Sequence, residues 1–373
     1  MNRFQYFLSH KKVFPLSMNI VYLKMDIVLL ILKLIVLVWD FITYPIYQAI
    51  YQPWKKQKLA EKVRSRCLSK FTTDSQMIFE APEKTNEVYL DFIKCQPKTM
   101  ADAWKWAVHK FNSKELLGTR EILKEEDEVQ TNGKMFKKYH LGDYRWITYE
   151  DADTTADYVG RGFRSLGLSR GMKVCMFADT RAEWMLTAQG CFKQGFPLVT
   201  LYTNLGEEAV VHGVNQTECT HVVTSHELLP KFRTILKDTP SITHIFYFEH
   251  QVESTNTEGF PEHVQIIPFY EVVQTGKKVC RSPEFDAIPP HENDTCIIMY
   301  TSGSTGVPKG VILLHRNVLA TLTSVFLSID FQNIKFNDET YFCFLPLAHI
   351  LELLIENVML MYGARLGYSS PTT

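Results

Sequence analysis

The sequence predicts an α/β fold with doubly wound sheets built of parallel βαβ units, preceded by a membrane anchor. Three features of the chain predict it. Between residues 173 and 248, short apolar runs alternate with helical patterns of about 10–15 residues, which is the rhythm of βαβ units. Residues 27–50 are strongly apolar. A loop rich in glycine, serine and threonine, residues 301–310, joins two further apolar runs.

The composition excludes several classes of protein. The 373 residues are 46% hydrophobic and 22% charged, an ordinary globular balance, and 13% aromatic residues exclude disorder as the main state. The net charge of −1 provides no overall field for nucleic acid, so we expect no nucleic-acid partner. None of the eight cysteines forms a CxxC pair, which argues against a zinc ribbon and favours small buried thiols in a reducing compartment.

Residues 27–50 are predicted to be a membrane segment, and we assign residues 1–54 to the anchor. As a helix this segment would be about 36 Å long, enough for a hydrocarbon core of about 30 Å. Lys33 and Asp40 interrupt it. Near the membrane centre each of these charges adds about 2.5–3.5 kcal/mol to the free energy of insertion, and each large apolar residue lowers it by about 0.3–0.6 kcal/mol. Summed over the segment, the free energy of insertion is therefore close to zero. A spanning helix and a monotopic hairpin, broken near Asp40 and Pro45, both remain open.

A basic cluster follows the apolar segment. Its members are Lys55, Lys56, Lys58, Lys62, Arg64, Arg66 and Lys70, opposed only by Glu61. Such a cluster marks the cytoplasmic side of a membrane and favours anionic headgroups. A cleavable signal peptide would need small residues at its cleavage site, but residues 40–51 are bulky and aromatic, which favours a retained anchor. Residues 55–98 form a basic juxtamembrane segment and linker in this interpretation.

The rest of the chain predicts alternating helices and strands. Residues 99–112 have the apolar spacing of a helix, and residues 115–150 resemble a hairpin region with an acidic turn at residues 124–128. The later predicted helices are residues 151–166, 181–195, 210–216 and 227–238, and the predicted strands are residues 173–178, 197–201, 221–224 and 242–248. Residues 276–293 contain many prolines and polar residues and are predicted to be a loop.

The loop at residues 301–310 is the strongest functional signal. Three glycines, Gly303, Gly306 and Gly310, let backbone amides turn inward and form an anion-binding concavity. Lys309 supplies a positive charge, and Pro308 stiffens the approach to it. The loop is neither a Walker motif nor a G-x-G-x-x-G fingerprint. The candidate phosphate-binding residues are Thr301, Ser302, Gly303, Ser304, Thr305, Gly306 and Lys309. From composition alone, a flexible polar hairpin remains the alternative.

Two strings carry a family resemblance. Residues 300–310, Tyr-Thr-Ser-Gly-Ser-Thr-Gly-Val-Pro-Lys-Gly, resemble the phosphate-binding signature of the adenylate-forming enzymes. Residues 344–352, Phe-Leu-Pro-Leu-Ala-His-Ile-Leu-Glu, resemble that superfamily's next motif, whose histidine, here His349, lies near the acyl and adenylate pocket. Taken alone, His349 could also be a capping histidine at a buried strand end.

Further stretches resemble one branch of that superfamily, the animal long-chain fatty acid–CoA ligases of the membrane-anchored type 3 and type 4 group. These stretches are residues 117–121, 125–130, 180–184, 198–202 and 350–353. The resemblance implies an acid–thiol ligase that converts a fatty acid, ATP and coenzyme A into acyl-CoA, AMP and pyrophosphate through acyl-AMP. It implies Mg²⁺ as a cofactor, with the loop, Lys309 and Mg²⁺ sharing the charge of the triphosphate.

The resemblance also implies a location at a membrane. We expect the endoplasmic reticulum, with the soluble part facing the cytosol. Lipid droplets, peroxisomes and the outer mitochondrial membrane are the other membranes to consider.

Later motifs of the family do not occur in the 373 residues. These are the Tyr-Gly-x-Thr-Glu and Thr-Gly-Asp motifs and the C-terminal domain with its lysine. We therefore expect residues 99–373 to form an incomplete AMP-binding domain without a complete catalytic or metal site, which does not catalyse the reaction by itself. The alternatives are a membrane-tethered, non-catalytic module that binds a nucleotide or a partner, and another adenylating enzyme such as a luciferase-like one.

Overall fold

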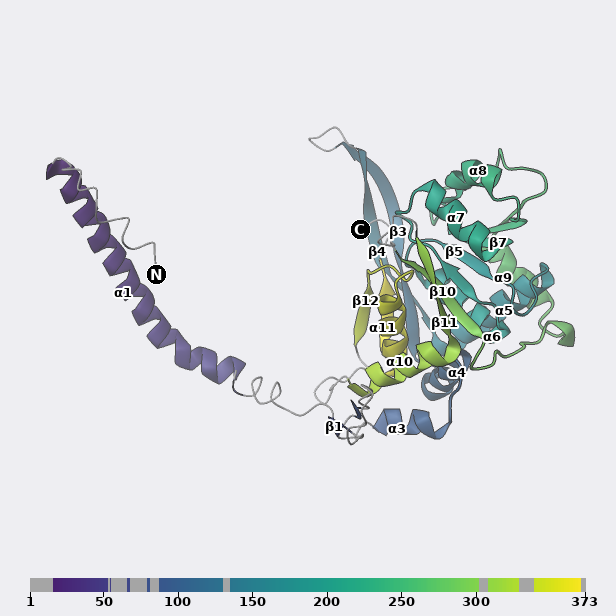
Figure 1. Ribbon diagram of the computed structural model, residues 1–373, viewed down its shortest axis with the longest axis horizontal. Coiled ribbons are helices and arrows are strands. Elements are labelled where there is room, and N and C mark those ends of the chain that lie inside the picture. Colours follow the sequence, from purple (N-terminus) through teal and green to yellow (C-terminus); the bar gives the residue numbers. More distant parts are fainter. Residues whose placement is uncertain are drawn as a thin grey trace, which may run out of the picture. The chain divides into compact units, whose positions relative to one another are not determined.

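A computed structural model describes most of the chain (Figure 1). The described residues are 16–52, 54, 66–67, 79–80, 87–129, 135–301, 308–328 and 339–369. The chain divides into two compact units, residues 1–83 and residues 84–373. Each unit is described by itself.

The first unit contains the apolar segment as one uninterrupted helix, α1 (Leu16–Tyr51) (Figure 1). Within it, Leu29–Tyr51 has a mean hydropathy of 2.0 and is long and apolar enough to cross a membrane. The helix continues through Asp40 and Pro45, so it lacks the break that the hairpin alternative requires. Proline removes one backbone hydrogen bond from a helix, a loss that membrane-spanning helices tolerate. Short strands β1 (Arg66–Cys67) and β2 (Phe79–Glu80) pair antiparallel.

The predicted basic cluster lies mostly outside the described residues. Arg66, in β1, is the one member whose backbone is described. The proposed contact of this cluster with anionic headgroups therefore stays a prediction.

The second unit is built on a seven-stranded sheet with the order β11-β10-β6-β5-β7-β8-β9. Its strands are β5 (Val174–Phe177), β6 (Leu198–Thr200), β7 (His221–Ser225), β8 (His244–Phe248), β9 (Gln265–Pro268), β10 (Thr295–Thr301) and β11 (Lys309–Leu314). All neighbours are parallel except β10 and β11, which are antiparallel. The doubly wound parallel sheet predicted from the sequence is confirmed.

Helices cover both faces of this sheet because alternate side chains of each buried strand point to opposite sides. In β5, Val174 and Met176 pack with α5 (Tyr149–Ser165), α6 (Ala182–Gln194) and α9 (Phe269–Lys278). Cys175 and Phe177 pack with α7 (Glu207–Thr217) and α8 (Phe232–Ile235) on the other face. The helix predicted at residues 227–238 is in fact three short pieces, a 3₁₀ turn (Leu229–Lys231), α8 and a second 3₁₀ turn (Leu236–Asp238). The predicted loop at 276–293 begins inside α9 and contains a 3₁₀ turn (Pro283–Phe285).

The second sheet has four strands, and of these only the hairpin was predicted. Its order is β12-β13-β3-β4, with β3 (Glu115–Val129), β4 (Met135–Thr148), β12 (Thr340–Cys343) and β13 (Arg365–Tyr368). The predicted hairpin is β3 with β4, and Figure 1 shows it as a long projecting ribbon. The prediction of an acidic turn at residues 124–128 is wrong, because these residues lie inside β3.

Opposite charges on β4 explain why the acidic run is a strand. Lys137 lies 3.1 Å from Glu125, and His140 lies 3.2 Å from Glu126. Cross-strand pairs of opposite charge stabilise an antiparallel ladder, so a run that is polar in sequence becomes a paired strand.

The remaining helices are α3 (Glu87–Lys94), α4 (Met100–Phe111), α10 (His315–Ser328) and α11 (Ile350–Met361). The predicted helix at 99–112 is α4, which begins with a capping box between Thr99 and Asp102. The helix α11 is the crossover between the parallel strands β12 and β13, and it carries the second predicted motif at its start.

Candidate functional site

The carboxyl ends of the parallel strands form one edge of the central sheet. Met299 of β10 pairs with Thr200 of β6, and Thr200 pairs with Met176 of β5. The residues that follow these three strands therefore lie side by side. In open α/β sheets this edge is where ligands bind, and both predicted motifs lie along it.

The first motif lies at the tip of the hairpin formed by β10 and β11. Thr301, the last residue of β10, pairs with Lys309, the first residue of β11, so the two ends of the predicted loop meet. Both side chains are exposed, and Lys309 forms no ion pair with any described residue. An exposed hydroxyl beside an unpaired lysine suits a phosphate group. Ser302, Gly303, Ser304, Thr305 and Gly306 lie outside the described residues, so their role stays a prediction.

Tyr300 fixes the base of this hairpin. Its side chain is buried, and its hydroxyl donates to Oε1 of Gln216 in α7 at 2.6 Å. Burial raises the pKa of Tyr300 to about 12, so the hydroxyl stays protonated and remains a donor. Opposite it, a Cβ added at Gly310 would lie 3.2 Å from Cζ of Tyr300 and 3.0 Å from Cγ2 of Ile298. The glycine lets β11 lie close against the ring.

The second motif is held across the same edge by two threonines. Thr180, just after β5, donates through Oγ1 to the carbonyl of Leu345 at 2.7 Å and accepts from the amide of Leu347 at 2.8 Å. Thr200, at the end of β6, donates to the carbonyl of Ala348 at 3.2 Å. The segment that precedes His349 therefore lies on the carboxyl ends of β5 and β6, next to the strand that carries the phosphate loop.

His349 is the N-cap of α11. Its Nδ1 accepts from the amide of Leu351 at 3.1 Å, and its ring lies 6.3 Å from the ring of Tyr202. His349 therefore caps a helix, as the alternative interpretation of the sequence expected. It is exposed, however, and not buried as that alternative required. Because Nδ1 accepts, the neutral ring carries its proton on Nε2. Capping thus fixes the ring and leaves Nε2 as a donor for a ligand.

Sequence reasoning missed the residues that position these two motifs. Tyr300 and Gln216 are far apart in the chain, and so are Thr180 and Leu345. A threonine that follows a buried strand is a local signal that could have pointed to Thr180, because it places a hydroxyl at the ligand edge of the sheet.

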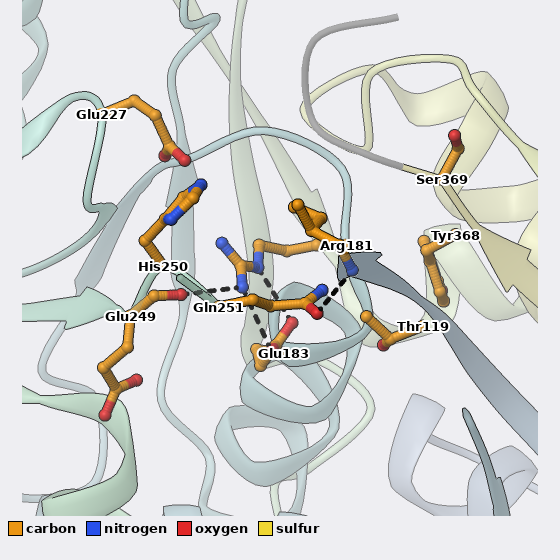
Figure 2. Close-up of a pocket in the computed structure, with 10 residues that line it drawn as sticks. Thr119, Arg181, Glu183, Glu227, Glu249, His250, Gln251, Tyr368 and Ser369 are labelled. Atoms are coloured by element: carbon orange, nitrogen blue, oxygen red, sulfur yellow. Dashed lines mark hydrogen bonds and ion pairs between the residues drawn. The ribbon is translucent and has the colours of Figure 1, made fainter. Parts of the chain in front are cut away.

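A small pocket lies further along the edge, at the ends of β5, β7 and β8 (Figure 2). Arg181 donates to both carboxylate oxygens of Glu183, at 2.9 and 3.2 Å, and to the carbonyl of Glu249 at 3.3 Å. Both carboxylate oxygens of Glu227 are buried there and accept no hydrogen bond from a described residue. The space open to water is about 20 Å³, room for about one water molecule. The pocket is therefore too small for a nucleotide.

Comparison with known proteins agrees with this geometry. A family model described as "AMP-binding enzyme" matches residues 125–373. The chain belongs to the AMP-binding enzyme family. The adenylate-forming resemblance seen in the two motifs is thereby confirmed.

Sequence relatives of this AMP-binding chain are long-chain acyl-CoA ligases by name. Long chain acyl-CoA synthetase 8 of Arabidopsis thaliana is 34% identical over 278 residues, which cover 74% of this chain and 38% of the relative. Long-chain-fatty-acid–CoA ligase 1 of Schizosaccharomyces pombe is 32% identical over 327 residues, which cover 84% of this chain and 47% of the relative. The chain thus spans less than half the length of these relatives. The animal branch is not tested by them and stays a prediction.

Solved structures support the fold. The adenylation domain of a carboxylic acid reductase from Segniliparus rugosus, in complex with AMP and a co-purified carboxylic acid, has a TM-score of 0.60 at 16% identity, covering 76% of this chain and 46% of that one. A long-chain-fatty-acid-CoA ligase from Archaeoglobus fulgidus has a TM-score of 0.54 at 21% identity, covering 73% and 47%. The fold is that of the adenylate-forming N-terminal domain.

Proposed function

We propose that this chain provides the phosphate-binding and acyl-pocket part of an ATP-dependent long-chain fatty acid–CoA ligase. The reaction joins a fatty acid and coenzyme A, with acyl-AMP as the intermediate and AMP and pyrophosphate as products. The observation that carries the proposal is the placement of the Thr301–Lys309 hairpin end and the His349 segment on one edge of the central sheet. The names of the sequence relatives support the substrate class.

The first step brings two anions together, since a carboxylate attacks the α-phosphate of ATP. Positive charge and N–H donors must therefore surround the phosphates. Lys309 supplies the charge, and Thr301, Ser302, Gly303, Ser304, Thr305 and Gly306 supply hydroxyl and backbone donors. Mg²⁺, when bound, would neutralise further phosphate charge. Nε2 of His349 would donate to an oxygen of the acyl or phosphoryl group, with its ring held by the N-cap bond.

The role of His349 is tested with two variants in the full-length product of the gene. His349→Asn keeps an N-cap side chain, because asparagine is among the best N-caps, but it lacks the imidazole. His349→Ala loses both. We expect both variants to lower kcat/KM for palmitoyl-CoA formation by at least about tenfold, because a positioned proton donor usually contributes at least that much to the rate. Only His349→Ala should lower the melting temperature. Full activity in His349→Asn would show that the histidine acts only as a cap.

The substrate class is tested by comparing carboxylates of different length with the same enzyme. We expect acyl-CoA from palmitate and little from acetate or benzoate. Light emission or acyl transfer without coenzyme A would instead favour another adenylating enzyme. The 373-residue polypeptide assayed alone should form no acyl-CoA. If it binds ATP but forms no acyl-AMP, that result supports the non-catalytic module as the role of the isolated chain.

We further propose that α1 anchors the protein in the endoplasmic reticulum membrane, with the second unit in the cytosol. Support comes from the length and hydropathy of Leu29–Tyr51, none of whose residues is buried. The basic residues that follow would contact anionic headgroups.

A further inference from the structure

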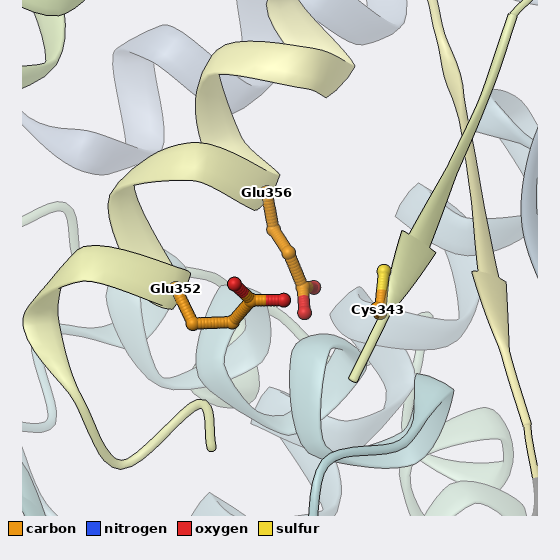
Figure 3. Close-up of side chains that lie close together, drawn as sticks. All are labelled: Cys343, Glu352 and Glu356. Carbon is orange, nitrogen blue, oxygen red and sulfur yellow. The ribbon is translucent and has the colours of Figure 1, made fainter. Parts of the chain in front are cut away.

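A buried cluster of a thiol and two carboxyl groups lies between β12 and α11. The side chains are Cys343, Glu352 and Glu356, here called the Cys–Glu–Glu cluster (Figure 3). One ligand atom from each lies within 4.8 Å of the others. Glu352 and Glu356 are each 0% exposed, and Cys343 is 4% exposed. Fully buried glutamates are rare unless something pairs with them.

Helix spacing and the end of one strand bring the three groups together. Glu352 and Glu356 are four residues apart on α11 and so project from one face of the helix. Cys343 is the last residue of β12 and pairs with Tyr368 of β13. Because α11 connects these two strands, its inner face lies against their carboxyl ends, where the thiol is placed.

Each carboxyl group has one paired oxygen and one unpaired oxygen. Tyr341 donates to Oε2 of Glu352 at 2.9 Å, and Tyr368 donates to Oε2 of Glu356 at 2.5 Å. Oε1 of both glutamates is buried and accepts no hydrogen bond from a described donor. No ion pair with a described lysine, arginine or histidine involves either glutamate. Two buried carboxyl groups and a thiol lie together, and no described lysine, arginine or histidine pairs with the carboxyls, which defines a place for a cation.

We propose that the Cys–Glu–Glu cluster binds one divalent transition metal ion, with Zn²⁺ as the best fit. A thiolate beside two carboxylates suits Zn²⁺, whereas Mg²⁺ and Ca²⁺ take oxygen ligands alone. The ligands would be Sγ of Cys343 and Oε1 of Glu352 and Glu356. The two tyrosine hydroxyls hold the other carboxylate oxygens and so orient the ligands.

Metal binding forms one metal–sulfur and two metal–oxygen bonds. Protons carried by the free thiol and carboxyl groups leave to solvent as these bonds form. The ion would join the end of β12 to the inner face of α11, the helix that His349 caps. Its role would be to hold these two elements together, and Glu352 is also the last residue of the second motif.

The test uses the purified 373-residue chain in detergent, freed of metal with a chelator and titrated with Co²⁺ alone. Cobalt bound to a thiolate gives a near-ultraviolet charge-transfer band. We expect this band to saturate at one Co²⁺ per chain and to be displaced by one Zn²⁺. Cys343→Ser should abolish the band, and Glu356→Gln should weaken Co²⁺ binding by at least about tenfold. Cys95→Ser, at an exposed free cysteine, should leave the titration unchanged.

Two results would overturn the proposal. One is a folded wild-type chain that gives no thiolate band with Co²⁺ and takes up no Zn²⁺, a result that needs no variant. The other concerns the double variant with Glu352→Gln and Glu356→Gln. If its melting temperature equals or exceeds that of the wild type, with or without Zn²⁺, the two carboxyl groups share a proton instead of binding a metal ion. Neither readout involves ATP, so the outcome is separate from that of the proposed function.

Discussion

At the scale of single residues, the candidate site depends on side chains that hold backbone rather than contact a ligand. Thr180 is the clearest case, because one hydroxyl both donates to Leu345 and accepts from Leu347. Replacing it leaves a carbonyl and an amide without partners in a half-buried position.

We therefore expect Thr180→Val to lower the free energy of unfolding by about 1–3 kcal/mol, the cost of leaving such groups unpaired. Thr243→Val, at an exposed threonine that donates to the carbonyl of Thr220, should change it by about 0.5 kcal/mol or less. Urea denaturation measures both values. Equal effects in the two variants would show that Thr180 does not hold the segment.

His315 gives the second prediction at this scale. Its side chain is buried, and Nδ1 accepts from the amide of Met100 at 3.3 Å. Burial lowers the pKa of His315 from 6.5 to about 4. Because this folded-state pKa lies below the unfolded one, the unfolded chain binds the proton first as the pH falls. The stability that neutral His315 contributes is therefore fully present above pH 6.5 and is lost as the pH falls from about 6.5 to 4.

The full loss for this one histidine is about 3 kcal/mol. His315→Gln keeps an acceptor for the Met100 amide and does not titrate, so it should remove that part of the acid sensitivity. Free energies of unfolding between pH 8 and 4.5 measure it. His221, whose pKa burial also lowers to about 4, would still contribute. An unchanged pH dependence in the variant would contradict the assignment.

At the scale of elements, α5 and α9 pack so closely that glycine is required between them. A Cβ at Gly276 would lie 1.8 Å from the carbonyl oxygen of Tyr158, an impossible contact with backbone. We expect Gly276→Ala to destabilise the protein by about 3 kcal/mol or more, at the upper end for overpacking. Gln274→Ala on the same helix is the matched control and should be near neutral. The measurement is the melting temperature of each variant. Similar melting temperatures for Gly276→Ala and Gln274→Ala would mean that the two helices can move apart without loss of stability.

The elements also show what could be predicted from the sequence. The buried strands of the central sheet and the helices between them have strong local patterns, such as the apolar run of β5, and these predictions are confirmed. The strand order of the second sheet could not be predicted, because Leu117 of β3 pairs with Leu366 of β13 across most of the unit. The acidic run in β3 was misjudged for a different reason, because its polar composition favours a turn and the opposite charges that pair with it lie on the neighbouring strand β4.

The same limit applies to the candidate site. Lys309 and His349 could be identified from their motifs, which are local strings. The contacts that Tyr202, Thr180 and Gln216 make with these motifs could not be predicted, because only tertiary packing brings these residues together. Whether Ser302, Gly303, Ser304, Thr305 and Gly306 hold phosphate stays a prediction.

At the scale of the whole molecule, the first unit is expected to determine where the protein resides. Leu34→Asp with Val38→Asp places two charges in the apolar span, each costing about 3 kcal/mol near the membrane centre. We expect this double variant to leave the membrane pellet after an alkaline wash, while Gln48→Asp, near the end of the span, remains in it. Identical pelleting of all three proteins would contradict a role for α1 as the anchor.

The central claim is that the β10–β11 hairpin binds the phosphates of ATP, and equilibrium binding of Mg·ATP to the 373-residue chain tests it most directly. Loss of a charge-assisted contact should weaken ATP binding by about tenfold or more in Lys309→Ala. Lys277→Ala, at an exposed lysine in the last turn of α9, should bind ATP as the wild type does. Measurable binding that falls only in Lys309→Ala is the result we predict. No ATP binding by the folded wild-type chain, or equal binding by both variants, would contradict the claim.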